Sequence, residues 1–356
     1  MFVEEKKHKR RVRYKGTHPR SYKEKYKEHN PEKYADTIAK VIAKGSTPAG
    51  MHISIMVDEI LDFLQIQPGQ KGLDATLGYG GHSRRMLEKL QGQGRLIGLD
   101  IDPIESQKTE ERLQKAGFGP DLFIRVLTNF ANIDQVARDY GKFDFLLADL
   151  GVSSMQIDNP ERGFSYKNHG PLDLRLNPQE GIPASKRLQE LSQEEIQGML
   201  EENSDEPYAQ ELAKAIYKNS HFGKEISTTT DLRNIIETTI EPYSKGMGQG
   251  EKKDFYKKTC QRVFQAIRID INSEFEVLDA FLTKLPQVMN PGGRIAILTF
   301  HSGEDRMVKK AFKAGKNLVY QEVARDVIRP SKEECVTNPR SRSTKMRWAI
   351  VKGEEA

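Results

Sequence analysis

Residues 73–83, LDATLGYGGHS, carry the clearest structural signal in the chain. The first letters fit the end of a buried strand, the glycines fit a tight turn, and the polar residues after them fit the start of a helix. Such a turn from strand into helix is typical of α/β proteins that bind nucleotide-like ligands. The alternative is that the glycines serve only to turn the chain.

Strand and helix signals alternate on both sides of this turn. Six short apolar runs have the length of covered strands: residues 72–76, 95–99, 122–127, 143–149, 290–300 and 344–353. Helical periodicity lies between the first four runs, which predicts a doubly wound, Rossmann-like α/β fold. From about 185 to 285 the periodicity is helical throughout, and one apolar stripe continues from 264 to 285. We therefore expect a helical block, inserted between the fourth and fifth strands, that is well placed to hold a substrate.

The composition bounds the class of protein. The 356 residues are 37% hydrophobic and 30% charged, which allows a buried core under a polar surface. No apolar run is long enough to span a membrane, and no apolar stretch follows the charged N-terminus as in a secretory signal. The two cysteines, Cys260 and Cys335, have neither metal-site spacing nor a disulfide framework. We expect a cytoplasmic protein with no membrane partner.

The positive charge is concentrated at the N-terminus. Of the formal net charge of +5, residues 1–50 contribute +8 (14 Lys/Arg against 6 Asp/Glu), which leaves 5 − 8 = −3 for the other residues. Four tyrosines are interspersed among the basic side chains: Tyr14, Tyr22, Tyr26 and Tyr34. Basic residues next to rings that can stack favour single-stranded nucleic acid. The alternative is a solvated tail.

The glycine turn departs from the dinucleotide fingerprint, because Ser83 stands where the third glycine would be. Asp74 ends the strand before the turn, and Asp100 ends the next strand, where a carboxylate can accept both ribose hydroxyls. This set resembles an S-adenosylmethionine (SAM) site. Asp74, Gly78 and Gly80 also match the D-P-F-x-G-S-G loop of amino-group methyltransferases. The alternative for Asp100 is a cap for the following helix.

A further acidic residue, Asp149, ends the fourth strand in the stretch LLADLGVSS. Amino-group methyltransferases carry Asp, Asn or Ser here, followed by two prolines and an aromatic residue; this chain keeps only the acidic residue. An acceptor is useful because the lone pair of an exocyclic base amine is delocalised into the ring. A hydrogen bond from the amine draws the nitrogen towards tetrahedral geometry, and alignment then matters more than a strong base. The alternative for Asp149 is a turn residue.

Several longer stretches occur in order: MHISIMVDEIL, DATLGYGGHSRRML, GRLIGLDIDP, DLGVSSMQIDNPERGFSYKNHGPLDLRLNP, RVFQAIRIDINSEFEVL, PGGRIAILTFHSGEDRMVK and NPRSRSTKMR. Together they resemble the bacterial RsmH (MraW) family of 16S ribosomal RNA cytosine-N4 methyltransferases, from about residue 51 to 351. The resemblance implies a class I SAM-dependent methyltransferase that acts on a cytosine in the decoding region. The expected parts are an arm at 1–50, a methyltransferase domain at 51–160 and 286–356, and a substrate-recognition insert at 161–285.

The resemblance assigns SAM contacts residue by residue. These contacts fall on Gly80, Gly81, His82, Asp100, Phe130, Asp149 and Gln156. Asp100 would take the ribose, and Phe130 would lie near the adenine. The alternatives are a polar helix start for His82 and plain core packing for Phe130.

On the substrate side, the resemblance gives catalytic roles to Asp149, Asp173 and His301. Asp173 and Arg175 belong to a loop expected over the active site, where they face the RNA or brace each other as an ion pair. His301 is expected to contact the cytosine rather than a metal, because no second metal-type residue is near it in sequence. We expect no metal site. Four basic residues are expected to meet phosphate: Arg340, Arg342, Lys345 and Arg347.

The chain departs from the family pattern in three places. Gly303 replaces the leucine of FHSLEDR, KKTCQR stands where a KHPATR-like run is usual, and the basic arm is additional. These features indicate a divergent second copy of the family and leave the RNA target open. The alternatives are another RNA, a non-catalytic SAM- or ribosome-binding paralogue, and an NAD oxidoreductase, which Ser83 disfavours. The expected partner is 16S rRNA in the small subunit, with a homodimer left open.

Overall fold

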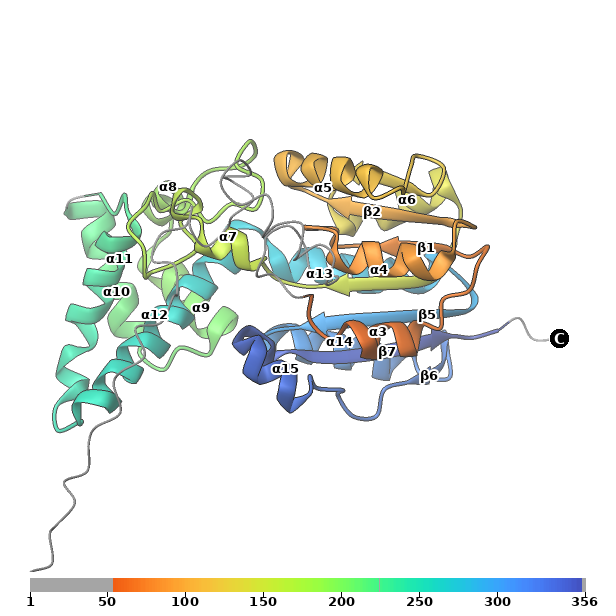
Figure 1. Ribbon diagram of the computed structural model, residues 1–356. Coiled ribbons are helices and arrows are strands. Elements are labelled where there is room, and N and C mark those ends of the chain that lie inside the picture. The colour runs from red at the N-terminus through yellow and green to blue at the C-terminus, as the bar shows by residue number, and fades with distance from the viewer. Residues whose placement is uncertain (1–53, 224, 354–356) are drawn as a thin grey trace, which may run out of the picture. The chain divides into compact units, whose positions relative to one another are not determined.

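The computed structural model describes residues 54–223 and 225–353, and the basic arm lies outside these residues. Within them, one sheet has the strand order β3-β2-β1-β4-β5-β7-β6. Its strands are β1 (Lys71–Asp74), β2 (Arg95–Asp100), β3 (Phe123–Leu127), β4 (Phe143–Asp149), β5 (Met289–Thr299), β6 (Tyr320–Val323) and β7 (Lys345–Val351). Neighbours among β1 to β5 are parallel, and β7 runs antiparallel between β5 and β6 (Figure 1). The expected doubly wound α/β sheet is confirmed, and β6 is an addition.

Helices cover both faces of the sheet (Figure 1). One face carries α3 (Val57–Leu64), α4 (Gly81–Leu90) and α5 (Pro103–Lys115). The other carries α6 (Ile133–Tyr140), α13 (Glu274–Lys284) and α14 (Ser302–Gly315). Leu64 and Met86 are buried on the first face, and Phe281 and Phe312 on the second. The near-continuous apolar strands, with Leu146 and Leu147 both buried, are thus covered on two sides.

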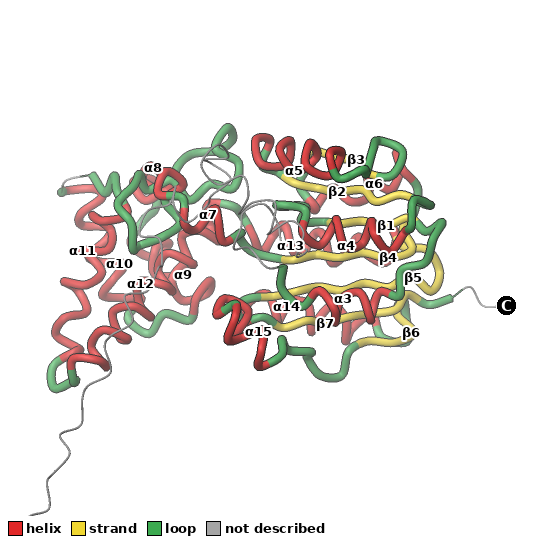
Figure 2. Tube along the Cα trace, viewed as in Figure 1, coloured by secondary structure: helices red, strands yellow, loops and turns green. Residues whose placement is uncertain are grey.

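The residues between β4 and β5 form a second, helical core. Its helices are α8 (Ala184–Glu190), α9 (Gln193–Ser204), α10 (Ala209–Phe222), α11 (Thr229–Ile240) and α12 (Gln249–Ile271), seen in Figure 2. Apolar side chains such as Leu212, Ile236 and Ile267 meet in its centre. A short helix, α7 (Ser154–Asp158), and a 3-10 turn, η3 (Pro160–Arg162), lead into it from β4. The expected helical insertion between the fourth and fifth strands is confirmed.

The apolar stripe at 264–285 divides between the two cores. The periodicity predicts one continuous packing surface, but the helix breaks at Asn272. The Asn272 side chain donates to the backbone carbonyls of Arg268 and Leu174, both at 2.8 Å, and Ser273 has a left-handed φ of 47°. After the break, α13 packs on the sheet instead of on the helices. The cores therefore meet near Ser273 rather than at the expected boundary of 285.

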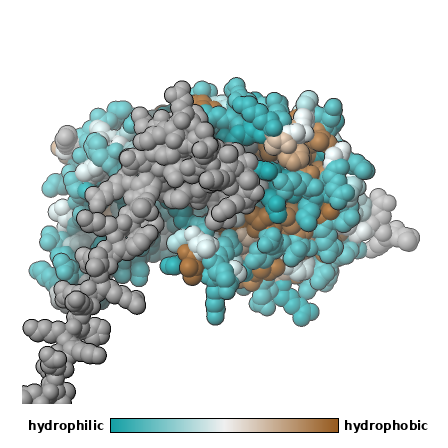
Figure 3. Space-filling model, viewed as in Figure 1, coloured by the Kyte–Doolittle hydropathy of each residue, from teal (hydrophilic) through white to brown (hydrophobic). Residues whose placement is uncertain are grey.

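The surface of the described residues is polar. The face drawn in Figure 3 is mainly hydrophilic, with small hydrophobic areas. None of the helices within residues 54–223 and 225–353 has the length and apolar character of a membrane span. Among the large apolar side chains described, the most exposed are Phe222, Val336 and Leu318, at 79%, 76% and 73%.

The strand order reverses between β1 and β4, which makes the carboxyl ends of these strands the switch point of the sheet. Ligands of open α/β sheets bind outside the strand ends at such a point. Asp74, Asp100 and Asp149 are the last residues of β1, β2 and β4. The fold therefore gathers three carboxylates at one edge, where the chain also enters the helical core.

Candidate active site

The glycine turn after β1 is fixed by its neighbours. Gly78 and Gly80 have φ of +47° and +73°, in the left-handed region that favours glycine. A Cβ on Gly80 would lie 2.6 Å from the Thr109 side chain, so a larger residue would not fit. The Gly78 amide donates to Asp100 at 2.9 Å, and the Thr109 hydroxyl donates to the Gly78 carbonyl at 2.6 Å. The turn thus has one defined shape that a ligand can meet.

Asp74 and Ser83 form a buried pair beneath the turn. The Ser83 hydroxyl donates to the Asp74 carboxylate at 2.5 Å, and both side chains are buried. Burial raises the pKa of Asp74, against the lowering effect of the Ser83 hydrogen bond. A glycine at position 83 could not make this bond. The residue that breaks the dinucleotide fingerprint therefore holds Asp74 in place.

Asp100 accepts one backbone hydrogen bond on each carboxylate oxygen, from the amides of Gly78 and Asp102, both at 2.9 Å. Burial raises the pKa of Asp100 to about 6, against these two bonds. Each oxygen keeps a second lone pair, so the carboxylate can still accept ribose hydroxyls. The helix-cap role belongs to Asp102 instead, which accepts from the amides of Ile104 and Glu105 at 3.1 Å.

The Asp149 carboxylate faces the His82 ring. His82 Nδ1 lies 3.6 Å from Asp149 Oδ2, and His82 Nε2 lies 2.9 Å from the Ile55 carbonyl oxygen. Because a carbonyl only accepts, Nε2 carries a proton and Nδ1 is left facing the carboxylate. A neutral ring would present a lone pair to Asp149, so the contact is favourable only when one more proton sits on Nδ1 or on the carboxyl group. His82 therefore does more than begin a helix.

One oxygen of Asp149 is an open acceptor. Burial raises the pKa of Asp149 to about 6; the charge of His82 opposes this rise, and those of Asp74 and Glu304 reinforce it. Although 26% of the side chain is exposed, Oδ1 is buried and accepts no hydrogen bond from any described residue. A buried carboxylate oxygen without a donor is costly. The atom is therefore suited to an N–H group of a ligand.

His301 lies at the start of α14, directly after β5. Its Nε2 is 3.2 Å from Glu304 Oε1, and 11% of its side chain is exposed. Burial acts to raise the pKa of Glu304, but His301, the Phe300 amide and Arg268 outweigh burial and hold that pKa below its ordinary value. Because the charge of Glu304 also acts on Asp149, the structure brings His301 and Asp149 to the same end of the sheet.

Glu274 joins this group from α13. Ligand atoms of Glu274, His301 and Glu304 lie within 4.8 Å of one another, an arrangement that could hold a metal ion. Both carboxylate oxygens of Glu274 are bonded to Arg268, at 2.7 and 2.8 Å, and this guanidinium opposes a further cation. The expected lack of a metal site stays a prediction. Sequence reasoning missed Glu274, because the break at Asn272 that brings it to His301 has no local signal.

Two of the predicted SAM contacts have other partners in the structure. Gln156 and Ser153 form a capping box: the Gln156 side-chain oxygen accepts from the Ser153 amide at 2.9 Å, and the Ser153 hydroxyl accepts from the Gln156 amide at 3.2 Å. The Phe130 ring packs edge-on against Phe281, with 5.1 Å between centroids. Core packing thus accounts for part of the Phe130 surface. Contact of either residue with SAM stays a prediction.

The Asp173 carboxylate is held by Arg175 in a two-pronged ion pair. Nε and one terminal nitrogen of Arg175 donate to the two oxygens of Asp173 at 2.8 and 2.7 Å. Arg175 also donates to the Gly181 carbonyl at 3.1 Å, which closes the loop on itself. The two residues brace each other, one of the two arrangements expected. The catalytic role of Asp173 stays a prediction.

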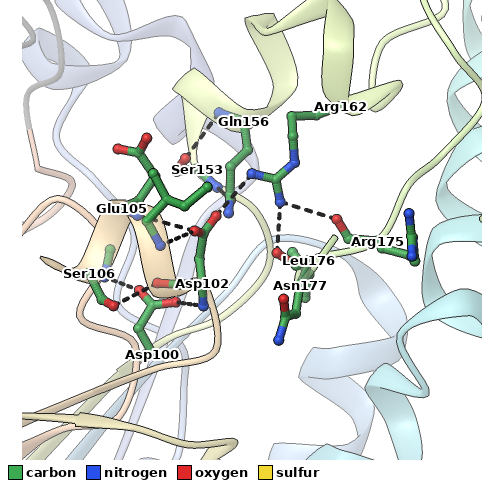
Figure 4. A network of polar contacts seen from close by, with 12 residues as sticks. Asp100, Asp102, Glu105, Ser106, Ser153, Gln156, Arg162, Arg175, Leu176 and Asn177 are labelled. Atoms are coloured by element: carbon green, nitrogen blue, oxygen red, sulfur yellow. Dashed lines mark hydrogen bonds and ion pairs between the residues drawn. The ribbon is translucent and has the colours of Figure 1, made fainter. Parts of the chain in front are cut away.

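Arg162 ties this loop to the sheet (Figure 4). Its guanidinium donates to the buried Asp102 at 2.9 Å and to the carbonyls of Leu176 and Arg175 at 2.7 and 3.1 Å. Because Asp102 caps α5 at the carboxyl edge of the sheet, the loop that carries Asp173 is anchored at that edge. Sequence reasoning missed this link, because the pair joins segments far apart in the chain.

The expectation that four basic residues near the C-terminus meet phosphate is wrong in part. Arg347 is buried and donates to Asp305 at 2.7 Å, and Lys345 donates to the same carboxylate at 2.9 Å. Arg340 donates to Asp158 at 2.8 Å. Arg347 and Lys345 lie on β7, between β5 and β6, where α14 supplies their acidic partner. A local run of basic residues cannot show such a partner.

In this sheet the antiparallel strand β7 lies between β5 and β6, and carboxylates stand at the ends of β1, β2 and β4. This arrangement is the fold of class I SAM-dependent methyltransferases. A sequence profile described as the MraW methylase family matches residues 49–352. The chain belongs to this family, as the sequence motifs indicate.

Relatives match along most of the chain. The ribosomal RNA small subunit methyltransferase H 1 of Agathobacter rectalis is 64% identical over 98% of this chain and 99% of its own length. The methyltransferase H 2 of Alkaliphilus metalliredigens is 58% identical over 97% and 98%. The methyltransferase H of Buchnera aphidicola is 38% identical over 84% of this chain and 97% of its own. The basic arm is therefore shared with the first two relatives, whereas the third matches nearly end to end over a shorter part of this chain.

Proposed function

We propose that the protein transfers a methyl group from SAM to the exocyclic N4 of a cytosine in the decoding region of 16S rRNA. The names of the relatives support small-subunit ribosomal RNA as the substrate, and the motifs support the cytosine amine. The proposal depends most on Asp149 Oδ1, a buried acceptor that no described residue donates to, at the carboxyl edge of the sheet.

The cofactor of this site is SAM, whose positively charged sulfur makes its methyl group electrophilic when it is bound. The turn at Gly80 and Gly81 would contact the ligand, and the missing Cβ of Gly80 lets this turn pack against Thr109 in the shape that the ligand meets. Asp100 accepts the ribose hydroxyls on the lone pairs that its two backbone bonds leave free. Phe130 would lie near the adenine, His82 would contact SAM beside the glycine turn, and Asp149 and Gln156 would complete the pocket.

Asp149 orients the target amine. Its Oδ1 accepts an amine hydrogen, which draws the nitrogen towards tetrahedral geometry and frees the lone pair for attack. His82 engages Oδ2, so that Oδ1 is the oxygen left for the substrate. Transfer of the methyl group would break its bond to sulfur, leave a neutral thioether and make the nitrogen cationic; the proton that the nitrogen then loses would pass to Oδ1. The raised pKa of Asp149, about 6, makes it a better proton acceptor than an ordinary aspartate.

The other predicted residues act on the RNA. His301 contacts the cytosine, and the braced loop that carries Asp173 covers a base that is unstacked into the pocket. The insert at 161–285 holds the RNA around that base, and the basic arm adds contacts to phosphate. This function places the protein in the cytoplasm, with the small ribosomal subunit as its partner. A homodimer stays a prediction.

The test offers methyl-labelled SAM and the protein to small subunits, naked 16S rRNA, DNA and bulk protein, and digests labelled RNA to nucleosides. We expect label in N4-methylcytidine from small subunits. Label in another nucleoside, or in another RNA alone, would overturn the proposal in favour of a retargeted enzyme. Tight SAM binding without transfer to any of the four would indicate a non-catalytic paralogue. A parallel titration with NAD checks the oxidoreductase alternative.

A further inference from the structure

The C-terminal end of α10 carries a group of three rings, two of which are exposed. Phe222, the last residue of this helix, is 79% exposed, the largest fraction among the exposed large apolar side chains described. The rings of Tyr217 and His221 stack, with 4.0 Å between centroids and 30° between planes. The Tyr217 and Phe222 rings meet edge-on at 6.0 Å. Three rings thus form one surface rather than scattered contacts.

Packing of the helical core explains the position of Tyr217 but not the exposure of His221 and Phe222. The buried face of α10 is formed by Ala209, Leu212, Ala213 and Ile216. Tyr217 is half-buried and packs against the helical core, whereas His221 and Phe222 are exposed. A fully buried phenylalanine would contribute roughly 2–3 kcal/mol, and Phe222 contributes almost none of it to folding. Single exposed apolar residues are common, but a stacked group at a helix end is not a single residue.

One of the rings, that of His221, is held in place by polar contacts. His221 Nδ1 lies 2.9 Å from the Ser220 hydroxyl and 3.1 Å from the Tyr217 carbonyl. These contacts fix the His221 ring against Tyr217 before any partner binds. A rigid stacking surface loses little conformational entropy on binding.

Positive charge lies beside the rings. Lys214 and Lys218 are exposed, and with Phe222 they repeat every four residues along one side of α10. Neither lysine forms an ion pair with a described residue. Two glutamates close to α10 in sequence have other partners, because Glu211 accepts from the Tyr243 hydroxyl and Glu225 pairs with Lys186. Lysines one turn apart that lead to exposed rings suit the phosphates and an unpaired base of one RNA strand.

We propose that this end of α10, formed by Lys214, Tyr217, Lys218, His221 and Phe222, is a docking surface for single-stranded RNA. An unpaired base stacks on Phe222 and His221, and the two lysines meet the neighbouring phosphates. The proposal rests on the proposed function for the identity of its occupant. It adds a second RNA contact, on the helical core, to the pocket that receives the target cytosine.

The test measures binding of a fluorescein-labelled single-stranded RNA to the full chain by anisotropy. Loss of one base stack weakens binding by about 5- to 150-fold, so we expect this effect from Phe222→Ala. Phe222→Trp keeps a stacking ring and should bind as wild type, with quenching of its indole emission by RNA. Leu318→Ala is the matched control, because it removes an equally exposed apolar side chain near β6 and should change nothing.

The lysines have a separate signature. The Lys214→Gln/Lys218→Gln variant should reduce the slope of log Kd against log salt by about 0.7 per lysine, whereas Phe222→Ala should leave the slope unchanged. With small subunits as substrate, Phe222→Ala should raise KM and leave kcat near wild type, since the ring is not in the catalytic group.

Unchanged RNA affinity in Phe222→Ala would overturn the proposal. The proposal would also be overturned if Phe222→Ala lost self-association while its RNA binding stayed intact. The surface would then fit a second copy of the chain. Failure of the proposed function looks different: wild type would bind RNA through Phe222 and yet label no cytosine in the methyl-transfer assay.

Discussion

Replacing Gly303 with leucine, the residue usual in this family, should crowd the ring of Phe275. Gly303 is in the first turn of α14, and its φ does not require glycine. A Cβ built there would lie 2.6 Å from Phe275 Cζ and 3.2 Å from His301 Cε1. The Phe275 ring, whose centroid is 5.9 Å from that of His301, occupies the space that the leucine needs.

The magnitude follows from two opposing terms. Overpacking costs about 1–3 kcal/mol, and replacing a helical glycine returns up to about 1 kcal/mol. We expect Gly303→Leu to lower the free energy of unfolding by about 1–2 kcal/mol, and Phe275→Ala to lower it by about 2 kcal/mol, since its ring is half-buried. The double variant should be about 1 kcal/mol more stable than the sum of the two single losses would give. The reason is that alanine at position 275 makes room for leucine at position 303.

Urea unfolding of the four proteins without SAM measures this coupling, provided that the slope against denaturant stays constant. Gly198→Leu in α9 is the control, because a Cβ there meets nothing within 4 Å and we expect no loss of stability. The rate of methyl transfer should fall in Gly303→Leu and recover in the double variant as His301 regains its place. Additive effects, within about 0.5 kcal/mol, would refute the reasoning, since they would show that Phe275 does not limit the space.

Three further perturbations test the site. Asp149→Asn should lower the rate of methyl transfer by at least about 100-fold and leave SAM affinity, measured by calorimetry, within a few-fold; turnover near wild type would remove Asp149 from its assigned role. Folding raises the pKa of Asp149 from 3.8 to about 6, so protonation favours the folded state. The contribution of Asp149 to the free energy of unfolding should therefore increase as the pH falls through about 6 towards 4. Turnover should decrease over the same pH range. The Asp149→Asn variant, unfolded at each pH for comparison, should lack the gain in stability that comes from Asp149. Arg162→Ala leaves the buried Asp102 without its charge partner and should cost about 3 kcal/mol of unfolding free energy, whereas Arg85→Ala, which breaks an exposed pair with Glu88, should cost under about 1 kcal/mol; equal losses would contradict this ranking.

The sheet could be predicted from sequence because its strands are short apolar runs. The turn after the first strand could be predicted because its left-handed backbone favours glycine. The edge strand β6 was missed, since its central residues, Gln321 and Glu322, are exposed and give no apolar run. The break at Asn272 was missed for the opposite reason: apolar spacing continues through it while the partner surface changes. Local patterns report which face is apolar, and they do not report which core it meets.

The candidate site was predicted in the same uneven way. Asp100 and Asp149 follow directly from their places at strand ends. The partners that tune them, such as His82 for Asp149, depend on segments that only the fold brings together. Arg347 was misassigned because a basic residue in a short motif looks exposed, whereas Asp305 on α14 gives it a buried counter-charge.

The junction at Asn272 has a mechanical consequence. α12 is 23 residues long, which is about 35 Å, and Arg268 in its last turn is bonded to Glu274. A rotation of about 5° at that point displaces the far end of the helix by roughly 3 Å, a lever ratio set by the helix length alone. Conversely, a force on the far end of α12 acts through the whole helix on the residues that surround His301. A movement of the helical core would in this way reach the catalytic edge through the bond between Arg268 and Glu274.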